Sequence, residues 1–526
     1  MLRENNIWRS CRGGRLWGTA GSILAVACIA ALGFTLAPTS LWSEDSIPIA
    51  AVAALFILLL ISALASAVMQ NLGQRTALHR LALSTWWFLL ICEPLFDRKG
   101  ETYSAYQGAF SVQAYGEGIM WVLAFLVLLV LMLRQPSYLR SLFSGSYKWV
   151  VFFAVLCALS VSYSPGKLYA AAWAFKLIVV VILLHLIASL TRNLEDVVTF
   201  LKVTMWGFFI LTLVPLVIAF SDPSTAFDGA GGRLNAGPGP DAMTLTAASL
   251  MLLAMVLFSI ENRKHLIAVA LLGIVVMLLA LGKTGNVVGI FSALIFLLLQ
   301  KKVLRSIGLV LGVGALALVI ILTTPLAAHL ASYKGADTLT GRTVVWTAAL
   351  GAIDKSLILG HGYLATYFAW TRNSGLVTGF EHLHNGFLET AYNNGIAGFG
   401  LMILLHFAIL RNIFKSIGAA ATLRSRQSGD RRVRTAHLLA VGSLAIYINL
   451  FLNGMIAATF GGRAMSPFEL LLALFVVVEV LRRYTVQLLK DTDASGARTH
   501  REWGALSKPS RLQPGIPVAA SEGLPW

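Results

Sequence analysis

The sequence predicts an all-α, polytopic integral membrane protein, and three observations lead to this prediction. Hydrophobic residues make up 57% of the 526 residues and charged residues only 12%, whereas about a quarter of the residues in a soluble protein are charged. Apolar stretches of about 20 residues, the length with which a helix crosses a bilayer, recur along the chain. The net charge of +17 falls mainly on alternate connections, which is typical of cytoplasmic loops and does not suggest a nucleic-acid partner.

The apolar stretches give 14 candidate spans, and we expect about 12–14 transmembrane helices. The first 11 lie within residues 18–323, near 18–37, 47–69, 81–96, 118–133, 149–163, 168–189, 198–220, 242–260, 266–282, 285–299 and 304–323. Three more lie within residues 394–483, near 394–411, 437–459 and 467–481. The stretch at 81–96 is the weakest, because it is short and contains Glu93 and Pro94.

The remaining segments complete the expected organisation. Residues 1–17 are basic and are expected to lie in the cytoplasm. Residues 324–393 form a long connection on the outer face, and connections of that length usually carry function. Residues 484–526 are polar and contain Gly, Pro and Ser, so we expect a disordered cytoplasmic tail. Both termini are therefore expected on the inner side.

Metal and nucleotide sites are not indicated. The four cysteines are scattered, without a CxxC pair or a Cys/His cluster, so neither a zinc site nor a disulfide framework is expected. The run Gly282-Lys283-Thr284 looks like part of a phosphate-binding loop. However, the first glycine of that motif would fall on Met277, which lies inside a span, so we reject a nucleotide site.

The long outer connection contains three groups of candidate residues. Arg342 opens a stretch in which Val345, Ala348, Leu350 and Ile353 are spaced for an amphipathic helix. A Gly-hinged turn follows at Gly360-His-Gly-Tyr363, and ionisable side chains cluster between Glu381 and Glu389. The histidines of this connection are His361, His382 and His384.

Imidazole can take a proton from a sugar hydroxyl near neutral pH, which makes these histidines candidate bases. The alternative that they are structural stays open. Tyr363 and Glu389 could orient the base or an acceptor, although Glu389 could instead complement a helix dipole.

Two outer cations lie near the expected starts of helices. Arg233 falls in the Gly- and Pro-rich stretch 229–240, and Lys283 lies at the outer boundary between two spans. Three spans begin on this face, beside Arg233, Lys283 and His384, and helix N-termini together with cations favour phosphate. Asn385 and Thr284 are candidate N-caps. These features predict a site for a lipid diphosphate, although each cation could also be an interfacial anchor.

Two charged residues fall within or near the end of a predicted span. Lys176 lies near the centre of the stretch 168–189 and is costly there unless it is paired or hydrated, so it leaves a transport path open as an alternative. Glu479 lies near the end of the last span and is expected to be a boundary residue.

Three motifs together resemble the O-antigen ligase and polysaccharide polymerase superfamily, most closely its exopolysaccharide polymerase branch. They are Thr340-Gly-Arg-Thr-Val-Val-Trp346, Leu357-Ile-Leu-Gly-His-Gly-Tyr363 and His382-Leu-His-Asn-Gly-Phe-Leu-Glu-Thr-Ala-Tyr-Asn-Asn-Gly-Ile-Ala-Gly398. Weaker similarity extends to Leu159-Ser-Val-Ser-Tyr-Ser-Pro165, so the resemblance covers about residues 150–415.

The resemblance implies a membrane-embedded, inverting, metal-independent glycosyltransferase without a cofactor. Such an enzyme works at the periplasmic face of the bacterial inner membrane and takes glycan from undecaprenyl diphosphate. The implied partners are this donor, a saccharide acceptor and membrane lipids, with a chain-length regulator or export complex as a further partner.

The resemblance also implies roles for individual residues. His384 matches the general base, and Arg233 and Arg342 match diphosphate-binding arginines. Lys283 stands where many members have an arginine, so it can neutralise phosphate without forming a bidentate fork. The expected supporting residues are Glu389, Tyr363, His382 and Asn385.

We favour polymerisation of exopolysaccharide or O-antigen repeat units as the function. The alternative within the same chemistry is an O-antigen ligase, which transfers finished polymer to lipid A core. The alternative from another class is a polysaccharide or lipid transporter. A transporter would be expected to show repeats and interrupted helices near the midplane, which the sequence does not indicate.

Overall fold

The computed structural model describes the greater part of the chain after the first two predicted spans. The described residues are 74–96, 112–134, 141–221, 240–280, 282–323, 342–372, 383–427, 429–456 and 466–506, with Tyr138 and Leu234. The predicted spans at 18–37 and 47–69 lie outside them, as do Arg233 and His382.

The predicted fold class is confirmed, since every element of the described residues is helical. Among the described residues, five helices are long and apolar enough to cross a membrane: Lys167–Leu190, Leu194–Ala219, Asp241–Glu261, Gly386–Arg426 and Arg431–Gly454. Each of the five coincides with a predicted span. The total of 14 spans stays a prediction.

The first half of the described chain follows the predicted spans closely. Its elements are α3 (Gln74–Phe96), α5 (Val112–Arg134), α7 (Lys148–Ser160), η4 (Val161–Tyr163), α8 (Lys167–Leu190), α9 (Leu194–Ser221), α11 (Pro240–Glu261), α12 (His265–Ala280), α13 (Lys283–Leu299) and α14 (Val303–Thr323). Helix α3 begins seven residues before the predicted stretch, so the weakest candidate is in fact a helix of 23 residues.

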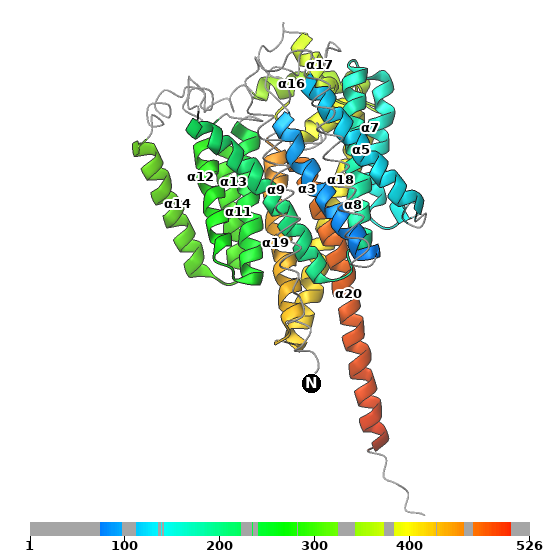
Figure 1. Ribbon diagram of the computed structural model, residues 1–526, viewed down its shortest axis with the longest axis vertical. Coiled ribbons are helices and arrows are strands. Elements are labelled where there is room, and N and C mark those ends of the chain that lie inside the picture. The colour runs from blue at the N-terminus through cyan, green and yellow to red at the C-terminus, as the bar shows by residue number, and fades with distance from the viewer. Residues whose placement is uncertain are drawn as a thin grey trace, which may run out of the picture.

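The long outer connection contains its own short helices. They are α16 (Arg342–Ile353), η6 (Asp354–Ser356) and α17 (Ala365–Arg372), followed by the long helices α18 (Gly386–Arg426), α19 (Arg431–Gly454) and α20 (Ser466–Leu506). The long helices run roughly along one direction, α16 and α17 lie together at one end, and α20 projects from the opposite end (Figure 1).

Helix α11 lies at the centre of one half of this arrangement, because it contacts α9, α12, α13 and α19. Its side chains are buried almost throughout, including the small polar residues Thr244, Thr246 and Ser249. Small residues allow helices in a membrane to approach closely, and their hydroxyls can bond across the interface. Asn449 of α19 does so, donating to Ser249 at 3.4 Å.

The helix after the long connection starts earlier than predicted and is broken. Helix α18 begins at Gly386, eight residues before the predicted span, and its helical geometry is interrupted at Gly395 (φ 62°, ψ −164°). The part before the break therefore precedes the predicted span, and the part after it coincides with that span at 394–411.

The predicted disorder of the tail is wrong over residues 484–506. Helix α20 continues to Leu506 without interruption, and the turns that follow the predicted span still contact the rest of the fold. Thr485 is fully buried, and Asp493 forms an ion pair with Arg426 at the end of α18. Residues 507–526 lie outside the described part.

Lys176 is buried in α8, as its position in the sequence indicated. Its ammonium lies 3.8 Å from the ring centroid of Trp173 and 5.8 Å from that of Trp121. The negative face of an aromatic ring attracts a cation, so these rings partly replace the water that the ammonium has lost.

Candidate active site

Helix α16 packs on the start of α18 and forms one wall of the candidate site. Val345, Ala349 and Ile353 of α16 are buried together with Leu383 and Tyr392. Their spacing of four residues places them on one face, as the predicted amphipathic helix requires. The buried face is turned relative to the prediction, because Leu350 is 55% exposed.

The break in α18 is held by direct contact between two backbone segments. Gly360 and Gly395 both have positive φ, of 70° and 62°. A Cβ atom on Gly360 would lie 2.4 Å from the Gly395 nitrogen, and one on Gly395 would lie 2.2 Å from the Ile358 oxygen. No side chain fits at either position, which explains the glycine of the predicted turn.

Hydrogen bonds complete this contact on both sides of the break. The amides of His361 and Gly362 donate to the carbonyls of Tyr392 (2.9 Å) and Asn393 (2.8 Å), and the Ile396 amide donates to Leu357 (2.8 Å). The turn at 357–362 is thereby fixed to α18 over the segment that follows His384.

The segment of weaker similarity, residues 159–165, belongs to the same frame. The hydroxyl of Ser160 accepts the Tyr363 amide at 3.1 Å and lies 3.0 Å from Oδ1 of Asn394. The Ser164 hydroxyl donates to the Tyr363 carbonyl at 2.8 Å. Three stretches that are distant in the sequence therefore meet behind the start of α18.

His384 is held in an unusual backbone conformation between two specific contacts. Its φ is 50°, in the left-handed region that residues other than glycine seldom adopt. On one side, Trp346 Nε1 donates to the Leu383 carbonyl at 2.8 Å. On the other, Asn385 Oδ1 accepts the amides of Phe387 and Leu388 at 3.0 and 3.1 Å, so the predicted N-cap Asn385 is confirmed.

The surroundings of His384 keep its imidazole neutral. Burial is the main cause that lowers its pKa, and the nearby Arg342 guanidinium lowers it further, to about 4. Both effects disfavour the imidazolium, because it would lose water and face a like charge. At neutral pH the side chain is therefore a free base able to accept a proton.

Arg342 connects this histidine to the outer end of α11. Its guanidinium lies 3.5 Å from Asp241 Oδ2 in the first turn of α11. The Nε atom of Arg342 is buried and has no hydrogen-bond partner among the described residues. A guanidinium N–H thus remains available to an anion.

The other predicted cations lie at the edge of what the structure describes. Leu234, which follows Arg233, donates its amide to the Leu279 carbonyl at 3.0 Å, at the end of α12. Lys283 is the first residue of α13. Leu234 therefore lies against the end of α12, and Lys283 follows the short link between α12 and α13.

The start of α13 differs from the prediction in its cap. Gly282, not Thr284, is the N-cap residue, so the prediction for Thr284 is wrong. The reason is a close contact with α11: the Gly282 amide donates to Thr244 Oγ1 at 3.1 Å, and any Cβ atom on Gly282 would lie 2.4 Å from that hydroxyl.

The predicted supporting residues face inward. Glu389 is fully buried and accepts a hydrogen bond from the Thr366 hydroxyl of α17 at 3.3 Å. Tyr363 is also fully buried, within the main apolar core. His361 Nε2 lies 3.0 Å from the Ala352 carbonyl, and its ring is tilted against that of Tyr392, with the centroids 4.4 Å apart.

An apolar pocket of about 470 Å³ opens beside Asn385. Helices α16, α18 and α19 line it with Leu350, Leu388, Phe399 and Phe451 among other apolar side chains. Its walls suit a hydrocarbon chain, and it lies next to the residue that follows the candidate base.

Asp241, Trp346 and Thr366 were not predicted from the sequence. Only Trp346 had a signal, since it closes the motif that begins at Thr340. Asp241 and Thr366 are ordinary polar residues near helix starts, and their roles depend on contacts between distant segments.

The comparison with family models covers the same part of the chain. Residues 241–403 match the family model described as O-antigen ligase. The match extends from Asp241 of α11 through the break in α18, so it contains Arg342, His384 and Glu389. It does not distinguish the exopolysaccharide branch. A search of curated proteins found no match.

Proposed function

We propose that this protein, which belongs to the O-antigen ligase and polysaccharide polymerase superfamily through residues 241–403, transfers a glycan at the periplasmic face of the bacterial inner membrane. The donor is glycan on undecaprenyl diphosphate, and the acceptor is a sugar hydroxyl. We further propose that the acceptor belongs to another lipid-linked repeat unit, which makes the protein a polymerase.

One observation carries the proposal: the half-buried His384, whose surroundings keep its imidazole neutral, lies beside Arg342. A neutral imidazole can accept the proton of an attacking hydroxyl, and a guanidinium can bind a departing diphosphate through charge-assisted hydrogen bonds. Few other reactions need both groups together at a membrane surface. Arg233 and Lys283 are proposed to add positive charge to the same leaving group.

The reaction is a single displacement. The acceptor oxygen forms a bond to the anomeric carbon as its proton passes to His384, and the bond from that carbon to the diphosphate oxygen breaks. Attack opposite to the leaving group inverts the anomeric centre. The electron pair of the broken bond stays on the diphosphate, and the imidazolium later releases its proton to water.

Arg342 has opposite effects before and during this step. In the free site it disfavours the imidazolium. As the bond breaks, negative charge grows on the diphosphate. This charge attracts the Arg342 guanidinium and the imidazolium that forms at His384. The site therefore stabilises the transition state more strongly than the bound donor, which is the condition for catalysis. Glu389, Tyr363 and Asn385 support the arrangement by holding the first part of α18.

The apolar pocket gives the prenyl chain a place beside the diphosphate. Leu388 and Phe451 line it together with Asn385, so the first isoprene units could lie against α18 and α19 while the diphosphate reaches Arg342. Transfer of apolar surface from water into such a pocket contributes about 25 cal/mol per Å².

The charge distribution supports a site on the outer side. Helix α18 ends and α19 begins among Arg424, Arg431, Arg432 and Arg434, near the end from which α20 projects (Figure 1). Clustered arginines mark the cytoplasmic side. Helices α16 and α17 lie at the other end, which is then the periplasmic one.

The test is a transfer assay with purified full-length protein in nanodiscs and a defined diphospholipid-linked oligosaccharide. The proposal predicts longer lipid-linked glycans from the donor alone. A second candidate, the ligase, is favoured by the description of the matching family and predicts transfer only when lipid A core is added. No transfer under either condition, with glycolipid moving between leaflets of vesicles, would support a transporter and contradict both.

A further inference from the structure

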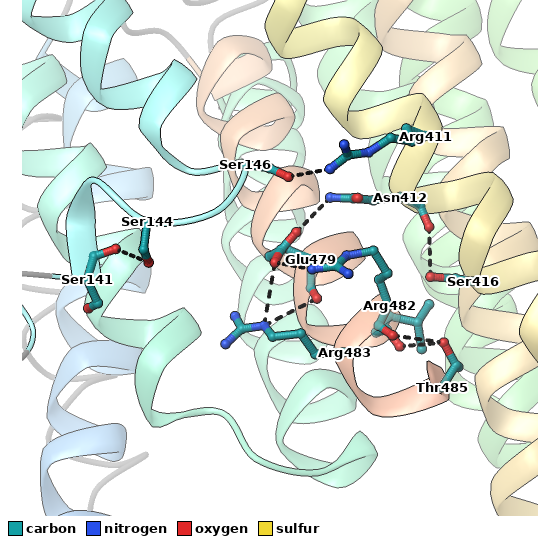
Figure 2. Close-up of polar contacts among 11 residues, drawn as sticks. Ser141, Ser144, Ser146, Arg411, Asn412, Ser416, Glu479, Arg482, Arg483 and Thr485 are labelled. Carbon is teal, nitrogen blue, oxygen red and sulfur yellow. Dashed lines mark hydrogen bonds and ion pairs between the residues drawn. The ribbon is translucent and has the colours of Figure 1, made fainter. Parts of the chain in front are cut away.

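A polar cluster lies midway along α18 and α20, where the predicted spans 394–411 and 467–481 end on the inner side, and away from the candidate active site. It is built around Glu479, a residue of α20 that is only 8% exposed. Arg482 donates to its carboxylate at 2.8 Å, Asn412 of α18 donates at 2.8 Å, and Arg483 lies 3.7 Å away. Figure 2 shows these side chains converging on Glu479. The residue is thus more than a boundary residue.

A short loop before α7 closes the cluster from the other side. The Ser146 hydroxyl accepts a hydrogen bond from Arg411 of α18 at 2.8 Å (Figure 2). A Cβ atom on the neighbouring Gly145 would lie 4.0 Å from the Glu479 carboxylate. Three separate parts of the chain therefore meet around one carboxylate.

Three arginines meet one carboxylate in this cluster. Arg482 and Arg483 both pair with Glu479, and Arg411 donates to the Ser146 hydroxyl. The Nε atom of Arg482 is buried without a hydrogen-bond partner among the described residues. A partly buried guanidinium is stabilised when an anion occupies its unused N–H groups.

The depth of the cluster indicates which anion is available. Arg482 lies 16 residues after the first residue of α20, and Arg411 lies 16 residues after the break at Gly395. At 1.5 Å per residue, each is about 24 Å from the outer end. Because the hydrocarbon core is about 30 Å thick, both guanidinium groups reach the headgroup region of the inner leaflet.

Arg411 also has the neighbours that a lipid would contact. Phe407 and Phe414, four residues before and three after it, share its face of α18 and are 62% and 58% exposed. In a phospholipid the phosphate is joined to the acyl chains. Arg411 at headgroup depth could bind the phosphate, while the two exposed phenylalanines contact the acyl chains.

We propose that Arg411, Arg482 and Arg483, with Ser146, form a binding site for the phosphate of an anionic phospholipid in the inner leaflet. Glu479 and Asn412 hold the guanidinium groups in place and do not bind the lipid themselves. The site would fix α18 and α20 to each other and to the loop before α7. Basic residues that are attracted to the membrane only in a general way need no buried partner. The buried carboxylate of Glu479 and the buried Nε of Arg482 therefore favour a specific site.

The experiment measures lipid binding by native mass spectrometry of the full-length protein, with dioleoyl phosphatidylglycerol or dioleoyl phosphatidylcholine as the probe. The variant is Arg411→Gln combined with Arg482→Gln. The matched control is Arg424→Gln combined with Arg434→Gln, which removes the same charge from exposed positions on the same side. Inorganic phosphate at the same concentration is tested by its effect on the unfolding temperature.

The expected result is preferential binding of phosphatidylglycerol by the wild type and the control, and binding weaker by about 10-fold or more in the variant, since a hydrogen bond to a charged group contributes about 1.5–3 kcal/mol. Equal loss in variant and control, or equal binding of both lipids by the wild type, would overturn the proposal. A wild-type stabilisation reproduced by inorganic phosphate alone would overturn the assignment to a lipid.

If the double variant does not fold, Arg411→Gln alone serves instead, because Arg411 is exposed and its only hydrogen bond in Figure 2 is to Ser146. It should still weaken phosphatidylglycerol binding, and unchanged binding would contradict the proposal. The measurement requires no glycan transfer, so its outcome is independent of the proposed enzymatic function.

Discussion

Replacing Gly395 by alanine tests whether the break in α18 positions the active site. A Cβ atom there would lie 2.2 Å from the Ile358 oxygen and 2.6 Å from the Gly360 nitrogen. At φ 62° and ψ −164° a residue other than glycine is strained by about 1–3 kcal/mol, and overpacking costs about 1–3 kcal/mol. The sum is about 2–6 kcal/mol, a large part of the stability of a typical domain.

The control is Gly400→Ala, five residues further along the same helix, where an added Cβ atom meets nothing within 4 Å. Alanine in a helix interior is favoured over glycine by about 1 kcal/mol, so this variant should be as stable as the wild type or more so. Both proteins are purified in detergent, and their unfolding temperatures and rates of glycan transfer are measured.

Gly395→Ala should lower both the unfolding temperature and the rate of glycan transfer. Since about 1.4 kcal/mol corresponds to a factor of ten in an equilibrium, loss of the docked turn should reduce transfer by about 10-fold or more. Wild-type stability and transfer in Gly395→Ala would refute the idea that the contact between residues 357–362 and α18 shapes the site.

Three further predictions concern the groups around the base. Because burial and Arg342 lower the pKa of His384 to about 4, its base form persists as pH falls, and the acid limb of kcat/KM should lie well below pH 6.5. Arg342→Gln should move the acid limb to higher pH but leave it below pH 6.5, since burial lowers the pKa of His384 more than Arg342 does. An acid limb of the wild-type enzyme at or above pH 6.5 would contradict this prediction. Asn385→Ala should cost about 1 kcal/mol of stability and slow glycan transfer. The control Asp430→Ala, which removes the cap of α19 on the inner side, should lower only the unfolding temperature. Equal transfer rates in these two variants would argue against a role for the Asn385 cap. Trp346→Phe removes a hydrogen bond of about 1 kcal/mol and should lower kcat with little change in KM for the donor, and an unchanged kcat would show that His384 is held by other contacts.

The spans could be predicted from the sequence because hydrophobic length alone decides them. The stretch at 168–189 became α8 (Lys167–Leu190) within a residue at each end. The N-cap at Asn385 was also predictable, since the amide side chain bonds locally. Features that depend only on local chemistry or on bilayer thickness can be predicted without knowing the fold.

The features that the sequence did not reveal depend on packing between distant segments. Thr284 is not a cap because Gly282 packs against Thr244 of α11. Residues 484–506 continue α20, and Asp493 in that segment pairs with Arg426 on α18. Glu479 resembles any boundary carboxylate until its partners on α18 and α20 are known. In each case the deciding contact joins residues that are far apart in the chain.

The most direct test of the central claim is the transfer rate of His384→Ala under single-turnover conditions. The purified protein receives a defined diphospholipid-linked oligosaccharide, and binding of this donor is measured separately. A general base contributes about 10²–10⁴-fold to a rate. We predict a loss of that size with donor binding unchanged, because Arg342 and the apolar pocket remain. Transfer at the wild-type rate by a normally folded His384→Ala protein would contradict the account.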